Sequence, residues 1–335
     1  MNNRFREVGL FGIKPTGQPH LANYLCLNST IKRDSLMLCF IADLHSLSEG
    51  YRLISRSMTR LMIGFCVSVF STKLLLNRCI VYIQSSMPLS PYLNWIVVCL
   101  SKPNDVNHAS SSRAQSNLGS LLYPSLMTAD IVLCRPTYLC VGSDQIKHIE
   151  YANTIITKFN KLFRLRILED DYEFVIRPQR LLRVLKVMSF KDPYKKMSKS
   201  NNDSSISILD SYLNIRTKVY SFKDNYMIIE SNELCNHPGV FNLISIYFLC
   251  TETNNHVLLS VIKPISIVVL KSLLTKLIYY KMYRIRKKTI RYLRMSGLLD
   301  KIVASGKDWM ENWCFSNVRH IQVMMGLLDK FKTSN

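Results

Sequence analysis

Two short segments carry residue types that can hold and activate a triphosphate. Residues 12–23 (GIKPTGQPHLAN) form a Gly/Pro turn followed by His20 and Asn23, three positions apart. On a helix this spacing puts both side chains on one face, and a helix N-terminus offers free N–H groups to phosphate. Residues 196–200 (KMSKS) place two ammonium groups around a small hydroxyl, which can neutralise charge that develops when phosphates are split. Either segment alone is a weak signal, but together they predict an ATP site.

The elements that must position these segments alternate between strand and helix. Apolar runs predict buried strands at 8–13, 35–43 and 79–84, and helical periodicity covers 20–32, 57–76, 120–133 and 144–159. Such alternation predicts a parallel, doubly wound α/β sheet. The chain has no G-x-G-x-x-G, which disfavours a dinucleotide site.

The polar stretch 101–117 predicts a loop, and a change of pattern near Ser204 predicts a domain boundary. From residue 208 onward the pattern is helical and rich in Lys and Arg. The sequence therefore predicts an α/β domain followed by a helical one.

Composition narrows the functional class. The net charge of the 335-residue chain is +21 with 48% hydrophobic residues, which favours a globular protein with a polyanionic partner such as nucleic acid. Its ten cysteines form no C-x-x-C pair, so we expect buried thiols in a reducing compartment and no structural metal. Lysines interrupt the most apolar stretch, 257–280, which argues against a membrane span, and no secretory signal is evident.

Asp130 is the third chemical signal, because it lies in the otherwise apolar run 126–133. A buried carboxylate is costly unless it has a purpose or a partner. A carboxylate accepts hydrogen bonds, so a buried one is expected to face donor groups. A helix residue paired with a nearby Lys or Arg is the structural alternative.

Four further stretches complete a resemblance to a known family: residues 40–47, 123–133, 141–150 and 237–243. With HLAN at 20–23 in place of the "HIGH" signature and an unaltered KMSKS, the chain resembles class I aminoacyl-tRNA synthetases. Within them it is similar to the tryptophanyl-tRNA synthetases of bacteria and mitochondria, over essentially its whole length.

The resemblance implies a role for each matching position. The catalytic set is His20, Asn23, Lys196, Lys199 and Arg113. The ATP-binding set is Lys14, Pro15, Thr16, Ala22, Asn23, Gly142, Ser143, Asp144, Val187, Lys196, Met197, Ser198, Lys199 and Ser200. The tryptophan-binding set is Asp130, Met127, Tyr123, His45, Val141, Gln145 and Leu10. Within this set the resemblance implies that Asp130 accepts a hydrogen bond from the indole N–H, and such a site rejects a phenyl ring. Mg²⁺ is expected to enter with ATP and to have no dedicated protein site.

The resemblance also implies an architecture and a reaction. We expect a Rossmann-like catalytic domain over 1–203 and a C-terminal α-helical domain over 204–335 that binds the tRNA anticodon. The reaction is ligation of L-tryptophan to tRNA(Trp) through a tryptophanyl-adenylate, in a homodimer without membrane attachment. The mitochondrial matrix is the expected location, with the bacterial cytoplasm as the alternative. A basic run is expected to contact the tRNA: Arg284, Arg286, Lys287, Lys288, Arg291 and Arg294.

Several positions depart from the family pattern. Ala22 replaces a Gly on which adenine rests, Lys14 stands where Gln is usual, and Leu10 stands where an aromatic is common. The 101–117 segment is short and keeps only Arg113 as a pyrophosphate contact. Three alternatives therefore stay open: a catalytically impaired RNA-binding relative, a tyrosine-specific sibling, and a small-molecule nucleotidyltransferase, which would not need the basic helical C-terminal third.

Overall fold

The computed structural model describes most of the chain. The described residues are 7–32, 34–48, 55–73, 78–110, 117–142, 145–163, 180–183, 187–195, 197, 205–222, 228–229, 237–252 and 265–329.

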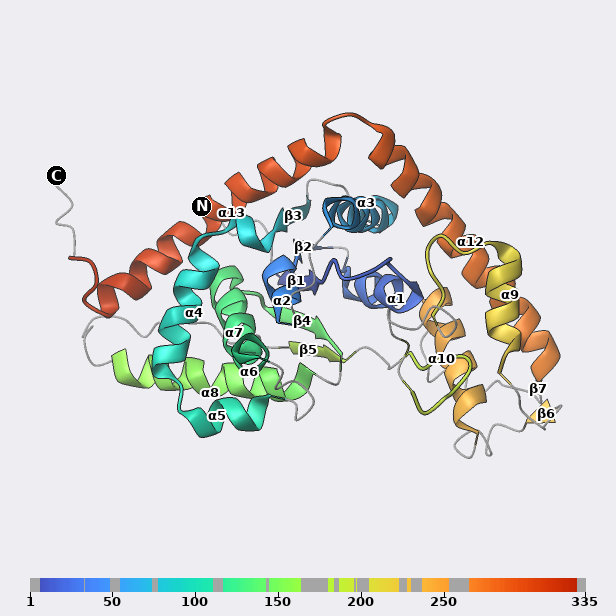
Figure 1. The fold of residues 1–335 in the computed structure, drawn as a ribbon, viewed down its shortest axis with the longest axis horizontal. Coiled ribbons are helices and arrows are strands. Elements are labelled where there is room, and N and C mark those ends of the chain that lie inside the picture. The colour runs from blue at the N-terminus through green and yellow to red at the C-terminus, as the bar shows by residue number, and fades with distance from the viewer. Residues whose placement is uncertain are drawn as a thin grey trace.

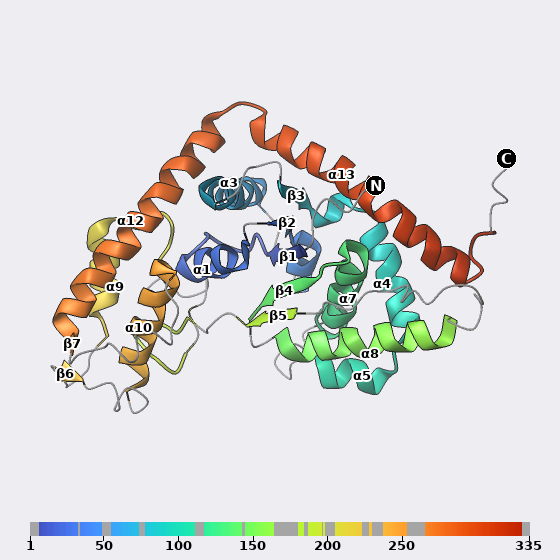
Figure 2. The same ribbon diagram turned by 180° about the vertical axis from the view of Figure 1, so that it is seen from behind.

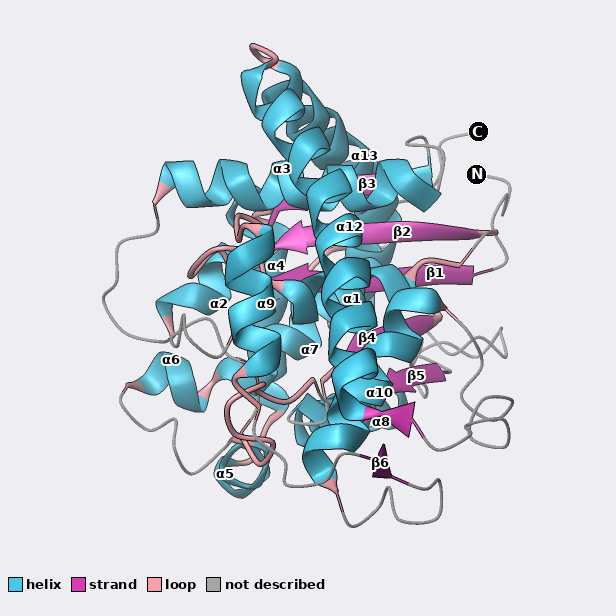
Figure 3. Cartoon of the chain, turned by 90° about the vertical axis from the view of Figure 1, so that its right-hand side faces the viewer, coloured by secondary structure: helices cyan, strands magenta, loops and turns pink. Residues whose placement is uncertain are grey.

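A five-stranded, fully parallel sheet forms the centre of the molecule (Figure 1). Its strands are β1 (Glu7–Ile13), β2 (Ser35–Ile41), β3 (Cys79–Ile83), β4 (Tyr138–Val141) and β5 (Arg180–Arg183), in the order β3-β2-β1-β4-β5. Figure 3 shows these strands stacked one above another. The strand order reverses between β1 and β4, and ligands of doubly wound sheets bind at the carboxyl ends of the strands at such a point.

Helices cover both faces of this sheet, which confirms the predicted fold class. α1 (Leu21–Thr30) and α3 (Arg56–Lys73) pack on one face, whereas α4 (Leu89–Leu100), α7 (Tyr123–Cys134) and α8 (Ile146–Phe163) pack on the other. β2 serves both layers: Met37 faces one cluster and Leu38 the other, and all seven of its residues are buried. A continuous apolar run is typical of a strand covered on both faces.

The C-terminal helices pack against the sheet and the helices that cover it. They are α9 (Tyr212–Tyr220), α10 (Pro238–Thr251), α12 (Ile267–Arg294) and α13 (Leu298–Met324). Figure 2 shows α12 and α13 as an arch, with α12 beside α3 and α13 across β3. Gly306 permits this crossing, because a Cβ there would lie 2.1 Å from the carbonyl oxygen of Val81. Side chains of α13 also donate to carbonyls at the end of α7, for example Asn317 Nδ2 to Val132 O at 2.8 Å.

The loop predicted for 101–117 is wrong for residues 103–109, which form helix α5 (Pro103–Ala109). Residues 111–116 lie outside the described residues. Pro103 occupies the first turn, where a missing N–H costs nothing, and Asp105 accepts from the backbone N–H of Lys102. Val106 and Ala109 are buried against α4 and α8. Short elements complete the fold: α2 (Asp43–Leu47), a 3₁₀ turn η2 (Gln84–Ser86), α6 (Leu118–Leu121), β6 (Ile228–Ile229) and β7 (Ile265–Ser266).

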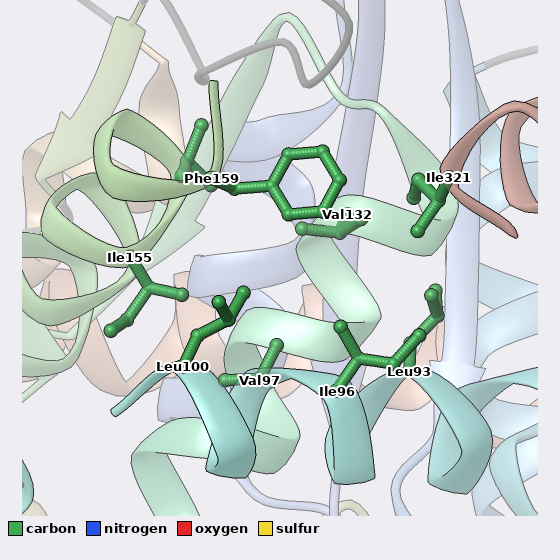
Figure 4. Close-up of a pocket in the computed structure, with 9 residues that line it drawn as sticks. Leu93, Ile96, Val97, Leu100, Val132, Ile155, Phe159 and Ile321 are labelled. Atoms are coloured by element: carbon green, nitrogen blue, oxygen red, sulfur yellow. The ribbon is translucent and has the colours of Figure 1, made fainter. Parts of the chain in front are cut away.

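The thiols and the apolar helices were also the subject of predictions. The cysteines whose side chains are described are free, and most of them are buried. Burial raises the pKa of Cys79 to about 12. No helix in the described part of the chain has the length and hydropathy to cross a membrane. Between α4, α7, α8 and α13 lies an apolar cavity lined by aliphatic side chains and Phe159 (Figure 4). It belongs to the core, since its lining offers no polar group to a nucleotide.

Candidate functional site

The His20 turn is held in place by the chain that follows the lysine loop. His20 caps the start of α1, and its backbone N–H donates to Asn23 Oδ1 at 3.2 Å. Leu21 N–H donates to Ile206 O at 2.8 Å, and Ile208 N–H donates to Pro19 O at 3.0 Å. Residues 205–208 therefore pair with the turn that opens α1, so the chain emerging from KMSKS reaches the predicted phosphate site.

The chain entering the lysine loop is equally fixed. Met197 N–H donates to Val187 O at 3.1 Å and Ser189 N–H donates to Lys195 O at 2.8 Å, which pairs residues 187–189 with Lys195 and Met197. Met197 is buried in the same cluster as α1. Asn242 of α10 accepts from Met188 N–H at 3.0 Å and donates to Met188 O at 3.1 Å. The flank after the lysine loop is thus bonded to the turn at His20, and the flank before it is bonded to α10, which contacts α1.

A buried carboxylate lies in the layer of helices on the other face of the sheet. Asp130 of α7 is only 4% exposed. Its Oδ1 accepts from Ser90 Oγ at 2.7 Å, and its Oδ2 accepts from Gln84 Nε2 at 2.7 Å and from His45 Nε2 at 3.1 Å. Carboxylate oxygens accept hydrogen bonds, so in this contact His45 takes the role of donor through Nε2. The structural alternative, a pairing with Lys or Arg, does not hold among the described residues.

Aromatic rings extend this polar cluster. The rings of His45 and Tyr123 lie 4.3 Å apart between centroids, and those of Tyr123 and His148 lie 5.2 Å apart. Lys14 Nζ lies 5.2 Å from the centre of the Tyr123 ring, within the range of a cation–π contact. Gln145 Oε1 is 2.7 Å from His148 Nδ1. The structure thus brings together predicted residues from β1, α2, α7 and the start of α8.

Predicted apolar residues border the same region. Leu10, Met127 and Val141 all pack in or against the core cluster formed by β1, β2, α4, α7 and α8. Gly142 follows β4, and its carbonyl accepts from Gln145 N–H at 2.9 Å. Among the ATP-site predictions, Pro15 is buried and Thr16 exposed beyond the end of β1, whereas Ala22 packs against the α1 core.

Seven of the predicted site residues lie outside the described residues: Arg113, Ser143, Asp144, Lys196, Ser198, Lys199 and Ser200. Their assignments stay predictions. Where the chain is described, no three His, Cys, Asp or Glu side chains gather in a way that could hold a metal ion.

Groups packed near Asp130 keep their protons. Burial raises the pKa of the Tyr82 phenol well above its ordinary value, and the neighbouring Cys134 and Asp130 raise it further. Burial likewise raises the pKa of the Cys134 thiol. Tyr82 Oη lies 3.1 Å from Cys134 Sγ. Two uncharged side chains therefore pack near the Asp130 carboxylate.

Four residues of the site were not among the predictions: Gln84, Ser90, His148 and Asn242. His148 and Asn242 lie within stretches that carry the family resemblance, but their contacts depend on the fold. Gln84 directly follows β3, and polar residues after parallel strands are a signal for a site. Ser90 offers no such signal, because only the packing of α4 against α7 brings it to Asp130.

Comparison with known proteins defines the class. The family model of class I tRNA synthetases for W and Y matches residues 6–261, more than half of the chain, so the chain belongs to this family. A tryptophan–tRNA ligase of Wigglesworthia glossinidia brevipalpis is 28% identical, and the match covers 97% of this chain and 99% of that protein. The mitochondrial tryptophan–tRNA ligase of Dictyostelium discoideum is 27% identical, and the match covers 90% of this chain and 81% of that protein. The fold is that of the tryptophanyl-tRNA synthetase of Mycoplasma pneumoniae, with a TM-score of 0.81 at 21% identity, over 96% of this chain and 98% of that one.

Proposed function

We propose that this protein is a tryptophan–tRNA ligase, which joins L-tryptophan to tRNA(Trp) through a tryptophanyl-adenylate. The carrying observation is Asp130, a buried carboxylate with three hydrogen-bond donors and no fourth partner among the described residues. A group of this kind suits a ring with one N–H donor. The full-length similarity to tryptophan–tRNA ligases supports the same substrate.

ATP is proposed to bind where the carboxyl end of β1 meets the start of α1. The proposed phosphate ligands are Asn23 and the backbone N–H groups at the start of α1. The hydrogen bonds of the described residues on either side of the lysine loop support the prediction that Lys196 and Lys199 act at the same place. The tryptophan carboxylate then attacks the α-phosphorus, and pyrophosphate leaves with Mg²⁺. Such chemistry needs positioning and charge neutralisation more than a strong base.

A buried polar atom supports a ligand in the amino-acid pocket. His45 Nδ1 has no hydrogen-bond partner among the described residues, although the ring is 3% exposed. Buried polar atoms normally have partners. A bound amino acid with its ammonium group offers the donor that this nitrogen lacks.

The tRNA is proposed to lie against the outer face of α12. Arg284, Lys287, Arg291 and Arg294 are exposed and recur at three- and four-residue steps, so they share one helix face. Two other members of the predicted basic run have different tasks. Arg286 donates to Asp210 O at 3.1 Å, and Lys288 donates to Ser71 O at 3.1 Å, which ties α12 to the rest of the molecule.

We further propose the predicted division at 203/204 into a catalytic and a tRNA-binding unit, the homodimer, and Mg²⁺ carried by ATP. The proposed setting is the mitochondrial matrix, with the bacterial cytoplasm as the alternative. Relatives of both kinds match the chain.

The test is ATP–pyrophosphate exchange in the presence of tryptophan or tyrosine, followed by acylation of tRNA(Trp). The proposal predicts exchange that depends on tryptophan and a much weaker response to tyrosine. Exchange that follows tyrosine would identify the sibling specificity, and no exchange with either amino acid would favour a non-catalytic RNA-binding relative.

A further inference from the structure

The carboxylate of Asp130 has a specific arrangement of occupied and free acceptor sites. A carboxylate offers about four lone-pair positions, two on each oxygen. His45 and Gln84 occupy both positions on Oδ2, and Ser90 occupies one on Oδ1. Within the described residues, one acceptor position on Oδ1 is left for a ligand.

The three donors are themselves fixed and come from separate elements. Ser90 lies in the first turn of α4 and is fully buried, and Gln84 directly follows β3 and is 1% exposed. Gln84 Oε1 also accepts from the His45 backbone N–H at 3.3 Å, so the amide cannot turn without losing two bonds. This network fixes the direction in which the free Oδ1 position points.

We infer that Ser90 and Gln84 are positioning residues that determine amino-acid specificity by holding Asp130 as a single, oriented acceptor. The inference rests on the proposed tryptophan substrate. Both residues already donate a hydrogen bond to Asp130, so they have fewer N–H or O–H groups left for a ligand oxygen. A phenol could therefore donate its O–H to Asp130, but its oxygen lone pairs would find few donors. An indole N–H needs only the free Oδ1 position.

The two residues differ in a way that can be measured. Ser90 is the one described donor to Oδ1, whereas Gln84 shares Oδ2 with His45. Removing the Ser90 hydroxyl opens a second position on the oxygen that takes the indole and leaves the buried charge less solvated. Removing the Gln84 amide leaves His45 in place, so its effect should be smaller.

The experiment compares tryptophan with an analogue that carries sulfur in place of the indole N–H. The measured quantity is the ratio of kcat/KM for the two compounds in ATP–pyrophosphate exchange. For the wild-type protein we expect a ratio of about 10 to 100, the range for a hydrogen bond to a charged group. Ser90→Ala should lower this ratio about tenfold, mainly through KM for tryptophan, and Gln84→Met should lower it about threefold.

The matched control is Ser68→Ala, because Ser68 is also fully buried and donates to a backbone carbonyl, Gly64 O, on the other side of the sheet. It should keep the ratio. Thermal melting of each variant separates misfolding from altered recognition, and Gln84→Met tests the inference if Ser90→Ala does not fold. A wild-type preference for tryptophan over the sulfur analogue that both variants keep within twofold would overturn this inference alone. A wild-type protein without tryptophan-dependent exchange would overturn the proposed function as well.

Discussion

The two ends of the site are built in different ways. The amino-acid end consists of buried side chains that bond directly to one another around Asp130. At the phosphate end, backbone hydrogen bonds fix Met197 and the flanks at 187–195 and 205–208. The chemistry of this end is predicted to depend on Lys196 and Lys199. Amino-acid selectivity is therefore expected to depend on the hydrogen-bond network around Asp130. The rate of adenylate formation is expected to depend on the lysines of the 196–200 loop.

The largest effect is expected at the phosphate end. Lys199→Ala should lower adenylate formation by about two to three powers of ten, because it removes one charge contact to the transition state. ATP–pyrophosphate exchange measures the change. The control is Lys195→Ala, since that lysine is 81% exposed and pairs with Asp192 in the adjacent turn. Equal exchange rates for the two variants would remove Lys199 from the catalytic set.

Asp130→Asn tests the amino-acid end. The amide keeps the size of the side chain but replaces one acceptor oxygen with a donor, so kcat/KM for tryptophan should fall about 100-fold. Steady-state exchange at varied tryptophan provides the measurement, and far-UV circular dichroism reports folding. Asp300→Asn is a control at an exposed carboxylate paired with Arg60. Unchanged kcat/KM in Asp130→Asn would mean that this carboxylate does not recognise the ligand.

Asn242→Ala tests a buried side chain that supports the phosphate end. Asn242 holds the backbone of Met188, in the flank before the lysine loop, with two hydrogen bonds. Loss of both bonds should destabilise the protein by about 1–3 kcal/mol and should lower exchange about tenfold by misplacing the lysine loop. Urea unfolding and exchange kinetics test the two effects. Asn312→Ala, which changes an exposed amide on α13, should leave both values unchanged. Loss of stability without loss of exchange would make Asn242 a structural residue only.

The outer face of α12 should contribute to affinity and not to the first reaction step. Lys287→Ala and Arg291→Ala should each reduce the slope of log affinity against log salt by about 0.7 per lost phosphate contact. Filter binding of tRNA at several salt concentrations gives this slope. Lys307→Ala on α13, where the side chain lies near Glu311, should keep it. A full slope in both α12 variants would place the tRNA elsewhere.

The smallest effect concerns Glu252, which follows α10. Burial raises the pKa of this carboxyl, but hydrogen bonds from Lys73 and Asn28 outweigh it and hold the pKa below its ordinary value. A lowered folded-state pKa stabilises the protein above the ordinary pKa and loses this effect as the pH falls through the folded value. Because the side chain is 43% exposed, Glu252→Gln should lower Tm by only about 1–3 °C at pH 7.

The difference in Tm between Glu252→Gln and wild type should vanish in acid, below the folded pKa. Glu311→Gln, at a similarly exposed carboxylate, should show little change at either pH. A Tm difference that persists in acid would assign the effect to packing.

Sequence patterns predicted three strands of the sheet, and β2 most clearly because it is covered on both faces and reads as one apolar run. The short strands β4 and β5 were not predicted. The patterns also failed at α5, where polar side chains on a short helix disguise the burial of Val106 and Ala109. Asp130 stood out because a carboxylate in an apolar helix needs a reason. Ser90 did not stand out, since its role comes from a contact across 40 residues of sequence. Local spacing finds groups that are chemically unusual, but tertiary packing decides which ordinary residues support them.

The most direct test of the account is the structure of this protein with bound tryptophan. We expect the indole nitrogen to lie about 2.9 Å from Asp130 Oδ1, with Ser90 and Gln84 still bonded to the carboxylate. An indole ring bound elsewhere, or with its nitrogen directed away from Asp130, would contradict the account.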